Sequence, residues 1–159
     1  MNYKNPSGTF KQATIMIVAA AFGAAAAAQV SLTDRRLASH VLFTTYSRSP
    51  DANLLPILGI TAETTVVIYM PGPDYKGILH WLLASGIAAE TPCMVISKAS
   101  QREQSLSSTT LSRLASLAPL AAPALLIVGR VAGQTSDSAA AFSWLLDSPE
   151  DTRHKSSIS

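Results

Sequence analysis

Few residues of this sequence could perform chemistry, and those few are far apart. The three histidines, His40, His80 and His154, are not separated by the three or four residues that place two metal ligands on one helix face. We therefore interpret each as an ordinary surface or half-buried side chain, and the sequence predicts no metal site.

Cys93 is the only cysteine, which excludes an intrachain disulfide and a cluster of thiolates. It opens a predicted strand, where a thiol usually packs as a small hydrophobic group. A reducing compartment, and hence the cytoplasm, is the simpler expectation. The Ser-rich stretch 105–112 lacks the glycines of a nucleophile elbow, so it does not indicate a hydrolase.

One cluster of glycine and proline, residues 71–74 (Pro-Gly-Pro-Asp), directly follows an apolar run. Ligands of open α/β sheets bind where strands end, so this position could belong to a binding site. An ordinary turn from a strand into a helix explains the same residues, and spacing alone favours that simpler interpretation.

The composition indicates one folded domain. The chain has 159 residues, 48% of them hydrophobic and 14% charged, which is enough apolar material for a core. Twelve basic residues against ten acidic ones leave a net charge of +2, and the basic residues are scattered. Nucleic acid is therefore not an expected partner, because phosphate binding needs a clustered basic face.

The N-terminal region contains an uncharged, Ala-rich run from Ala13 to Ala28, preceded by Lys4 and Lys11. This arrangement imitates a secretory signal peptide. The run is slightly short for a membrane span, and alanine is the best intrinsic helix former. We favour a buried helix, which makes a membrane association unexpected.

The remaining elements follow from periodicity and breaker residues. Thr33 or Asp34 could cap a short turn before the first strand, and Asp74 could cap a helix that stops at Gly86. The expected elements are strands at 41–46, 65–70 (a central strand), 93–97 and 123–128, a loop at 47–53, a ribbon or loop from Glu103, and a helix with apolar positions Leu111, Leu114 and Leu117.

This order predicts the α/β class, with a single three-layer-like domain in which helices flank a mixed sheet. The domain is expected at residues 13–132, between an N-terminal tail at 1–12 and a polar C-terminal tail at 133–159. Within that tail only the patch 139–146 has a composition that could form a final turn.

An ordered series of short motifs resembles one known family. Residues 21–23 (Ala-Phe-Gly) with the alanines after them, then 32–35 (Leu-Thr-Asp-Arg) and 37–43, are similar to an Ala-rich helix followed by "Gly-Ile-Pro-Leu-Thr-His-Arg" and "Leu-Ala-x-Ser-Val-Thr-Phe". Residues 67–70 (Val-Ile-Tyr-Met) are similar to "Val-Val-Tyr-Met-Gly". Residues 123–131 are similar to "Pro-Ala-Leu-Ile-Ile-Val-Gly-x-Val".

Shorter matches lie between these motifs, at 84–92, Gln104 and 110–111. The series from about Ala19 to Val131 resembles the C-terminal half of the tetrapyrrole methylases. It is most similar to the uroporphyrinogen-III C-methyltransferases, including the methylase module of siroheme synthase.

The resemblance implies S-adenosyl-L-methionine as cofactor, held in a cleft between two domains. The positions of this chain that would contact it are Met70, Ala99, Pro123, Ala124 and Leu125. All would act through backbone or packing contacts, as in a mostly apolar pocket. Met70 and Pro123 should therefore lie on one side of the molecule, and the Ala-rich helix should pack on the sheet.

The chain also departs from the family pattern. Pro71 and Ala99 replace glycines, Asp34 replaces a histidine, and residues 45–47 replace "Thr-Gly-His"; the "Pro-Gly-x-Thr-Ser" before the Ala-rich helix would fall on 16–20, where none of it is kept. The glycine-rich motifs of the family's first domain have no counterpart. The resemblance thus implies half of a cofactor cleft, which cannot by itself hold donor and acceptor in reactive geometry.

The expected function is methylation of uroporphyrinogen III to precorrin-2, in the siroheme and cobalamin pathway, by a truncated or split enzyme. The expected partners are a tetrapyrrole substrate and either a second copy or a chain carrying the missing domain. The signal-like start leaves open a non-catalytic, exported or membrane-tethered α/β interaction protein. An inactive pseudoenzyme is the third alternative.

Overall fold

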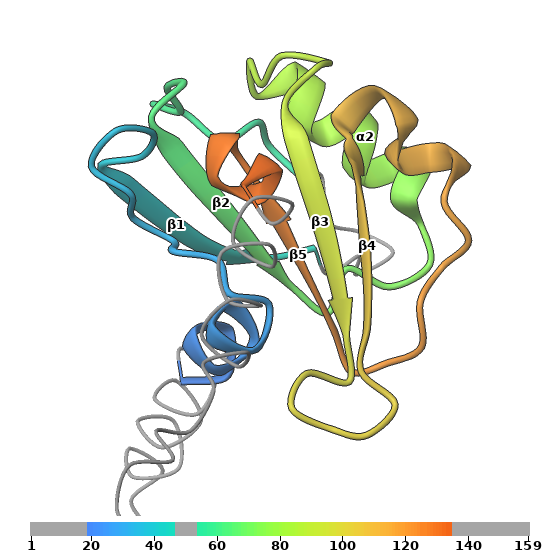
Figure 1. The fold of residues 1–159 in the computed structure, drawn as a ribbon. Helices are drawn as coiled ribbons and strands as arrows, with labels where there is room; N and C mark the ends of the chain where they lie inside the picture. Colours follow the sequence, from blue (N-terminus) through green and yellow to red (C-terminus); the bar gives the residue numbers. More distant parts are fainter. Residues whose placement is uncertain (1–18, 47–53, 135–159) are drawn as a thin grey trace, which may run out of the picture.

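A computed structural model describes residues 19–46 and 54–134 of the chain. Its centre is a mixed five-stranded sheet with the strand order β1-β2-β5-β3-β4 (Figure 1). The strands are β1 (His40–Thr45), β2 (Thr64–Tyr69), β3 (Pro92–Ser97), β4 (Ser105–Thr110) and β5 (Ala124–Val128). This architecture confirms the predicted α/β class and mixed sheet.

Strand directions place three carboxyl ends at one edge of the sheet. β1 and β2 are parallel, whereas β5 lies between β2 and β3 and is antiparallel to both. β4 is antiparallel to β3 and forms one lateral edge. Consequently β1, β2 and β3 run in the same direction, and the segments that follow β2 and β3 meet at the start of β5.

The three interior strands are buried because their sequences are continuous apolar runs. Val67 of β2 pairs with Ile127 of β5, and Ile127 pairs on its other side with Met94 of β3. All three side chains are at most 1% exposed. Runs of this kind suit strands that are covered on both faces.

One face of the sheet is covered by the Ala-rich helix, of which residues 19–27 are described. Its buried positions Ala21, Ala24 and Ala25 recur at helical spacing, and with Ala28, directly after the helix, they pack in one cluster with the β2, β3 and β5 side chains that point to this face. The short η2 helix (Arg130–Gly133) joins the same layer. The expectation that this helix packs on the sheet is confirmed.

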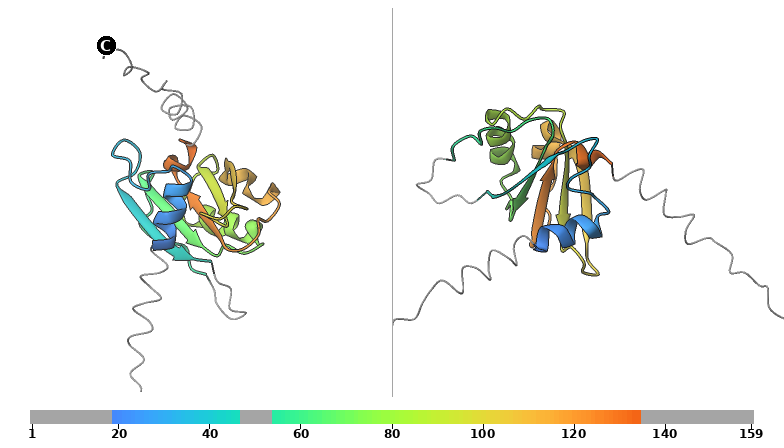
Figure 2. Two further views of the ribbon diagram at one scale, coloured as in Figure 1. Left: turned by 60° about the horizontal axis from the view of Figure 1, so that its bottom comes forward. Right: turned by 90° about the vertical axis from the view of Figure 1, so that its left-hand side faces the viewer.

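The other face is covered by α2 (Tyr75–Ala84) and by the 3₁₀ helix η1 (Leu111–Ser116). Asp74 caps α2 by accepting a hydrogen bond from the Gly77 backbone N–H at 3.0 Å, as predicted. The helix ends before Gly86, whose φ of +87° is in the left-handed region. Figure 2 shows the two helical layers on opposite sides of the sheet, so the domain has three layers.

Two sequence predictions need correction, whereas the 65–70 run forms the interior strand β2, paired on both sides and buried as predicted. The expected ribbon or loop is strand β4. The helix expected from Leu111 is a 3₁₀ helix. Leu111 and Leu114 are both fully buried, and a spacing of three residues suits the three-residue turn of a 3₁₀ helix.

Several predictions concern parts of the chain outside the described residues: the tail at 1–12, the start of the Ala-rich run, His154, the loop at 47–53, the patch 139–146 and the tail beyond residue 134. Where the chain is described, none of its helices has the length and apolar character that a membrane crossing requires.

Candidate functional site

A hollow of about 400 Å³ lies where β2 and β3 end and β5 begins. We call it the carboxyl-end hollow. Its wall includes all five positions predicted to contact a cofactor, namely Met70, Ala99, Pro123, Ala124 and Leu125. The structure therefore brings these residues together, although they come from three separate segments. In open α/β sheets this end of the strands is where ligands bind.

Backbone hydrogen bonds hold the rim of this hollow. The N–H of Met70 donates to the carbonyl of Ala124 at 3.1 Å, and the N–H of Lys98 donates to the carbonyl of Pro123 at 2.8 Å. The segments after β2 and β3 are thus both fastened to the start of β5. The buried hydroxyl of Ser97 adds a hydrogen bond to the carbonyl of Ala121.

Three non-glycine residues at this rim adopt left-handed backbone angles. The φ values are +47° for Met70, +49° for Lys98 and +64° for Ser100. Such angles are uncommon for residues with a side chain, and they concentrate at functional sites. Met70 also keeps 67% of its surface exposed although its side chain is apolar. The rim therefore presents an apolar side chain to the hollow and to solvent.

The opposite wall is the Ala-rich helix, which contributes Ala20, Gly23 and Ala24. These residues have little or no side chain, so the helix backbone borders the hollow closely. Gln104 links this helix to the rim. Its Oε1 accepts from the Ser100 N–H at 2.7 Å, and its Nε2 donates to the carbonyl of Ala27 at 3.4 Å.

Among the described residues of the wall, Tyr69 and Ser100 are the polar ones, and the hydroxyl oxygen of Tyr69 is itself buried. Tyr69 is 7% exposed and stacks on Phe43, with 6.3 Å between ring centroids. The prediction of contact residues missed both of them. The period of two along β2 could have identified Tyr69, because it points to the same face as Val67.

The cluster at residues 71–74 is the strand-to-helix turn of the simpler interpretation. Asp74 caps α2 and accepts a hydrogen bond from the Tyr46 hydroxyl at 3.0 Å. Of the positions after β2, it is Met70 that lines the hollow.

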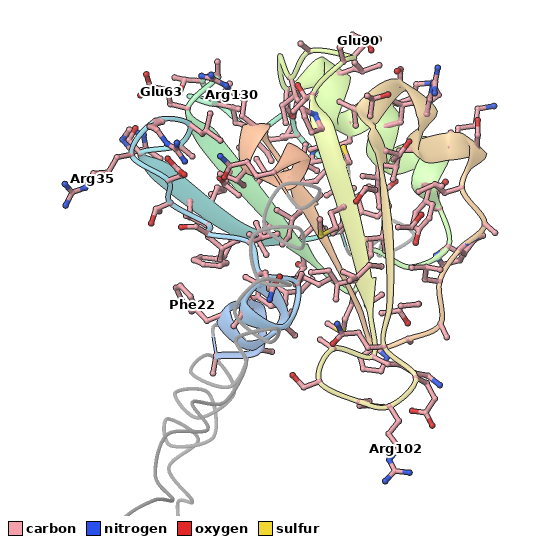
Figure 3. All side chains as sticks on the ribbon, viewed as in Figure 1. Phe22, Arg35, Glu63, Glu90, Arg102 and Arg130 are labelled. Carbon is pink, nitrogen blue, oxygen red and sulfur yellow. The ribbon has the colours of Figure 1, made fainter. Side chains whose placement is uncertain are left out.

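A second hollow, of about 370 Å³, lies at the other end of the same strands. We call it the amino-end hollow. It is bordered by the starts of β2 and β3 and by the end of β5, with Gly129 and the charged residues Glu90 and Arg130 in its wall. Figure 3 shows Glu90 and Arg130 at this end, away from Arg102 in the β3–β4 loop.

The described residues outside the hollows offer little reactive chemistry. Burial raises the pKa of the Cys93 thiol to about 12, so it packs as a small hydrophobic group, as predicted. Hydrogen bonds from the Arg36 side chain and backbone lower the pKa of Asp34 to about 2, and Asp34 closes the turn at Leu37 and Ala38. No cluster of potential metal ligands occurs among residues 19–46 and 54–134.

The carboxyl-end hollow is suited to binding rather than to proton transfer. The described residues of its wall provide apolar side chains, backbone groups and the polar residues Tyr69 and Ser100, and none of them carries an imidazole, a carboxylate or a thiol. Such a wall fits a flat, largely apolar ligand that carries a few hydrogen-bonding atoms.

Comparison with known proteins assigns a family to this arrangement. A sequence model of the Tetrapyrrole (Corrin/Porphyrin) Methylases matches residues 17–115. The uroporphyrinogen-III C-methyltransferase of Paracoccus denitrificans is 39% identical over 127 residues, which cover 77% of this chain and 44% of that protein. The siroheme synthase of Zymomonas mobilis is 36% identical over 143 residues, covering 89% of this chain and 30% of that protein.

Solved structures agree with this assignment. A uroporphyrin-III C-methyltransferase from Thermus thermophilus superposes with a TM-score of 0.58 at 27% identity, covering 72% of this chain and 49% of that one. The form of the Thermus enzyme complexed with S-adenyl homocysteine has a TM-score of 0.56 at 22% identity, covering 70% and 47%, and shows the shared fold. The chain spans less than half of the length of each of these relatives.

Proposed function

The chain belongs to the tetrapyrrole methylase family, and from this premise we propose that it provides one wall of the S-adenosyl-L-methionine site of a uroporphyrinogen-III C-methyltransferase. The observation that carries the proposal is the carboxyl-end hollow, in which Met70, Ala99 and residues 123–125 meet. A relative with this fold is complexed with S-adenyl homocysteine, the product form of the methyl donor.

S-adenosyl-L-methionine, when bound, supplies an electrophilic methyl group on a sulfonium ion. The residues of this chain would bind and orient it. Met70 and Leu125 offer apolar surface for the adenine or the thioether, and the fastened backbone at Met70 and Lys98 keeps that surface in place. Methyl transfer depends on holding donor and acceptor in near-attack geometry, which is a positioning task. The described residues of the hollow's wall carry no imidazole, carboxylate or thiol, which suits this role.

The other wall of the cleft belongs to the family's glycine-rich first domain. We propose that this domain completes the site. The acceptor would be a tetrapyrrole of the uroporphyrinogen class, converted to precorrin-2 on the way to siroheme and cobalamin. A second copy of the chain or a partner carrying the first domain would join it, in the cytoplasm. The curated relatives named uroporphyrinogen-III C-methyltransferase and siroheme synthase support this substrate class.

Titration with S-adenosylhomocysteine, followed by NMR on the ¹⁵N-labelled chain, tests the site. We expect shifts concentrated at residues 69–70, 96–100 and 123–125, with a dissociation constant weaker than about 0.1 mM because one wall binds alone. Shifts elsewhere would contradict the assignment of the site. A low-micromolar constant would instead contradict the claim that a second wall is needed.

Addition of the first domain as a separate polypeptide tests the activity. We expect tighter binding of the cofactor and mass-spectrometric detection of methylated uroporphyrinogen III. If the complex forms and binds the cofactor tightly but no methyl group is transferred, the enzymatic part of the proposal fails.

A further inference from the structure

The side chain of Gln104 bonds two segments of the chain that are far apart in the sequence. Its Oε1 accepts a hydrogen bond from the Ser100 N–H at 2.7 Å, within the β3–β4 loop, and its Nε2 donates to the carbonyl of Ala27 at 3.4 Å, 77 positions away. Both partners are main-chain atoms, so the bonds hold the course of the backbone in both segments. The half-buried amide thus joins the Ala-rich helix to the loop that follows β3.

The bond to Ala27 completes the end of the Ala-rich helix. The carbonyls of the last four residues of a helix, here 24–27, have no partner inside the helix. Backbone N–H groups of residues 28–30 bond the carbonyls of residues 24–26, with Gln29 in the left-handed region at a φ of +56°. The fourth carbonyl, of Ala27, is bonded by Gln104. The helix therefore ends on a side chain that comes from the β3–β4 loop.

The two segments that Gln104 joins form opposite walls of the carboxyl-end hollow. The helix lines the hollow with Ala20, Gly23 and Ala24, whereas the loop lines it with Ala99 and Ser100. Gln104 itself is not among the described residues of the wall. Its two hydrogen bonds therefore connect the walls from outside the space that a ligand would fill.

We infer that Gln104 is a positioning residue for the methyl donor, because it fixes the distance between the two walls of the carboxyl-end hollow. This inference rests on the proposed function, which takes the ligand to be S-adenosyl-L-methionine. Alanine and glycine side chains cannot change rotamer to follow a ligand, so the spacing of the two backbones decides how closely the apolar walls contact it. A small displacement of such a wall is enough to weaken a site that works by positioning.

Two substitutions of Gln104 break the bridge in different ways. In Gln104→Glu the carboxylate can still accept from the Ser100 N–H, but it cannot donate to the Ala27 carbonyl, and its charge is unfavourable at the carboxyl end of a helix. Gln104→Met, with an unbranched apolar side chain, removes both bonds. Each variant of the full ¹⁵N-labelled chain is titrated with S-adenosylhomocysteine and followed by NMR. Hydrogen exchange of the Ser100 amide, which should stay slow only in Gln104→Glu, checks which bond is kept.

Two control variants separate positioning from charge and from stability. Gln101→Glu introduces the same charge at an exposed position of the same loop. Ser85→Ala removes a comparable bridge on the other face of the sheet, where the Ser85 hydroxyl accepts from the Ile57 N–H at 2.9 Å and donates to the Trp81 carbonyl at 2.8 Å. Thermal unfolding of each free variant is measured, and the titrations are made well below the lowest melting temperature.

Both Gln104 variants are expected to weaken the binding of S-adenosylhomocysteine by about tenfold, because the helix wall loses its fixed distance from the loop. Gln101→Glu and Ser85→Ala should leave the affinity unchanged, although Ser85→Ala should lower the melting temperature. Unchanged affinity in both Gln104 variants would overturn the inference even if they melt earlier, since a purely structural bond does not change the affinity of the folded site. Weakening by Gln104→Glu alone, or equal weakening by a control, would overturn it as well.

The same titration separates this inference from the proposed function. If the wild-type chain shows no shifts around the carboxyl-end hollow, the proposed function fails and the inference fails with it. If the wild type binds there and both Gln104 variants bind equally well, the inference alone fails.

Discussion

The two hollows of this molecule have nearly the same size and very different construction. They occupy opposite ends of β2 and β3, with volumes of about 400 and 370 Å³. At the carboxyl end, non-glycine residues adopt left-handed angles around an apolar wall. At the amino end, the residue with the unusual φ angle is a glycine, Gly129, and the charged side chains of Glu90 and Arg130 border the opening.

The difference teaches that volume does not identify a binding site. Gly129 has a φ of +144°, and a Cβ atom there would lie 3.2 Å from the Thr64 carbonyl oxygen. The glycine therefore serves the packing of β5 against β2. At Met70, Lys98 and Ser100 the unusual angles are kept without glycine, so the fold sustains strain where three segments meet.

The largest expected effect comes from Gly129→Ala at the amino end. The added methyl group would meet the Thr64 carbonyl oxygen at 3.2 Å and the Thr65 Cα at 3.3 Å, in a backbone conformation that residues with a Cβ rarely adopt. We expect the free energy of unfolding to fall by about 3 kcal/mol, from backbone strain and overpacking together. Chemical denaturation measures it. A change within roughly 0.5 kcal/mol would show that position 129 does not need a glycine, and the two ends of the sheet would then not differ in this respect.

The pH dependence of stability should report the buried thiol at the start of β3. The pKa of Cys93 is raised from 9.0 to about 12, so in that window the unfolded state loses its proton before the folded state does. Stability is therefore unaffected by this group below pH 9 and falls as the pH rises through the window. The loss should reach roughly 2 kcal/mol at about pH 10.5.

Denaturation of the wild type and of Cys93→Ala at neutral and alkaline pH measures this contribution. The alanine variant should be less stable at neutral pH, because it leaves a cavity, and should lose less stability on going to alkaline pH. An equal alkaline loss in both proteins would show that the thiol is not responsible.

Filling each hollow in turn sharpens the comparison of their roles. Ala99→Trp places an indole in the carboxyl-end hollow, and Ala62→Trp does the same at the amino end. We expect Ala99→Trp to weaken S-adenosylhomocysteine by at least about tenfold and Ala62→Trp to leave the affinity unchanged. Titration followed by NMR compares the two, and a loss confined to Ala62→Trp would reverse the assignment.

The smallest effect is expected from Gly23→Ala, the same substitution as at Gly129 with the opposite sign. Gly23 lies in the Ala-rich helix, and apart from the nearby backbone of that helix no atom of the described residues would lie within 4 Å of an added Cβ. Alanine should raise the free energy of unfolding by about 0.5–1 kcal/mol, because glycine loses more backbone entropy in a helix. Chemical denaturation decides, and a destabilised variant would contradict a helix with open space at this position.

Much of the fold could be predicted from local patterns. The apolar runs that became β2, β3 and β5 are buried, and Asp74 and Gly86 bound α2 as their types indicate. β4 was harder, because its Ser- and Thr-rich sequence has no apolar alternation and its position depends on pairing with β3. The 3₁₀ form of η1 also depends on packing, since Leu111 and Leu114 suit two helix types.

The candidate site followed from the family resemblance and not from residue chemistry. Met70, Ala99 and residues 123–125 have no reactive groups, so spacing alone could not have selected them. Their meeting depends on β5 inserting between β2 and β3, a topology that local patterns do not encode. Tyr69 could have been added from the period of two along β2, but its place in the wall of the hollow is visible only in the three-dimensional arrangement.

The hydrogen bonds from Met70 to Ala124 and from Lys98 to Pro123 join main-chain atoms only. Because no side chain takes part in these bonds, most side-chain substitutions leave them intact, and the rim of the carboxyl-end hollow keeps its shape. Saturation mutagenesis should therefore find that folding tolerates more substitutions at residues 98–100 than at Tyr69 or Leu125.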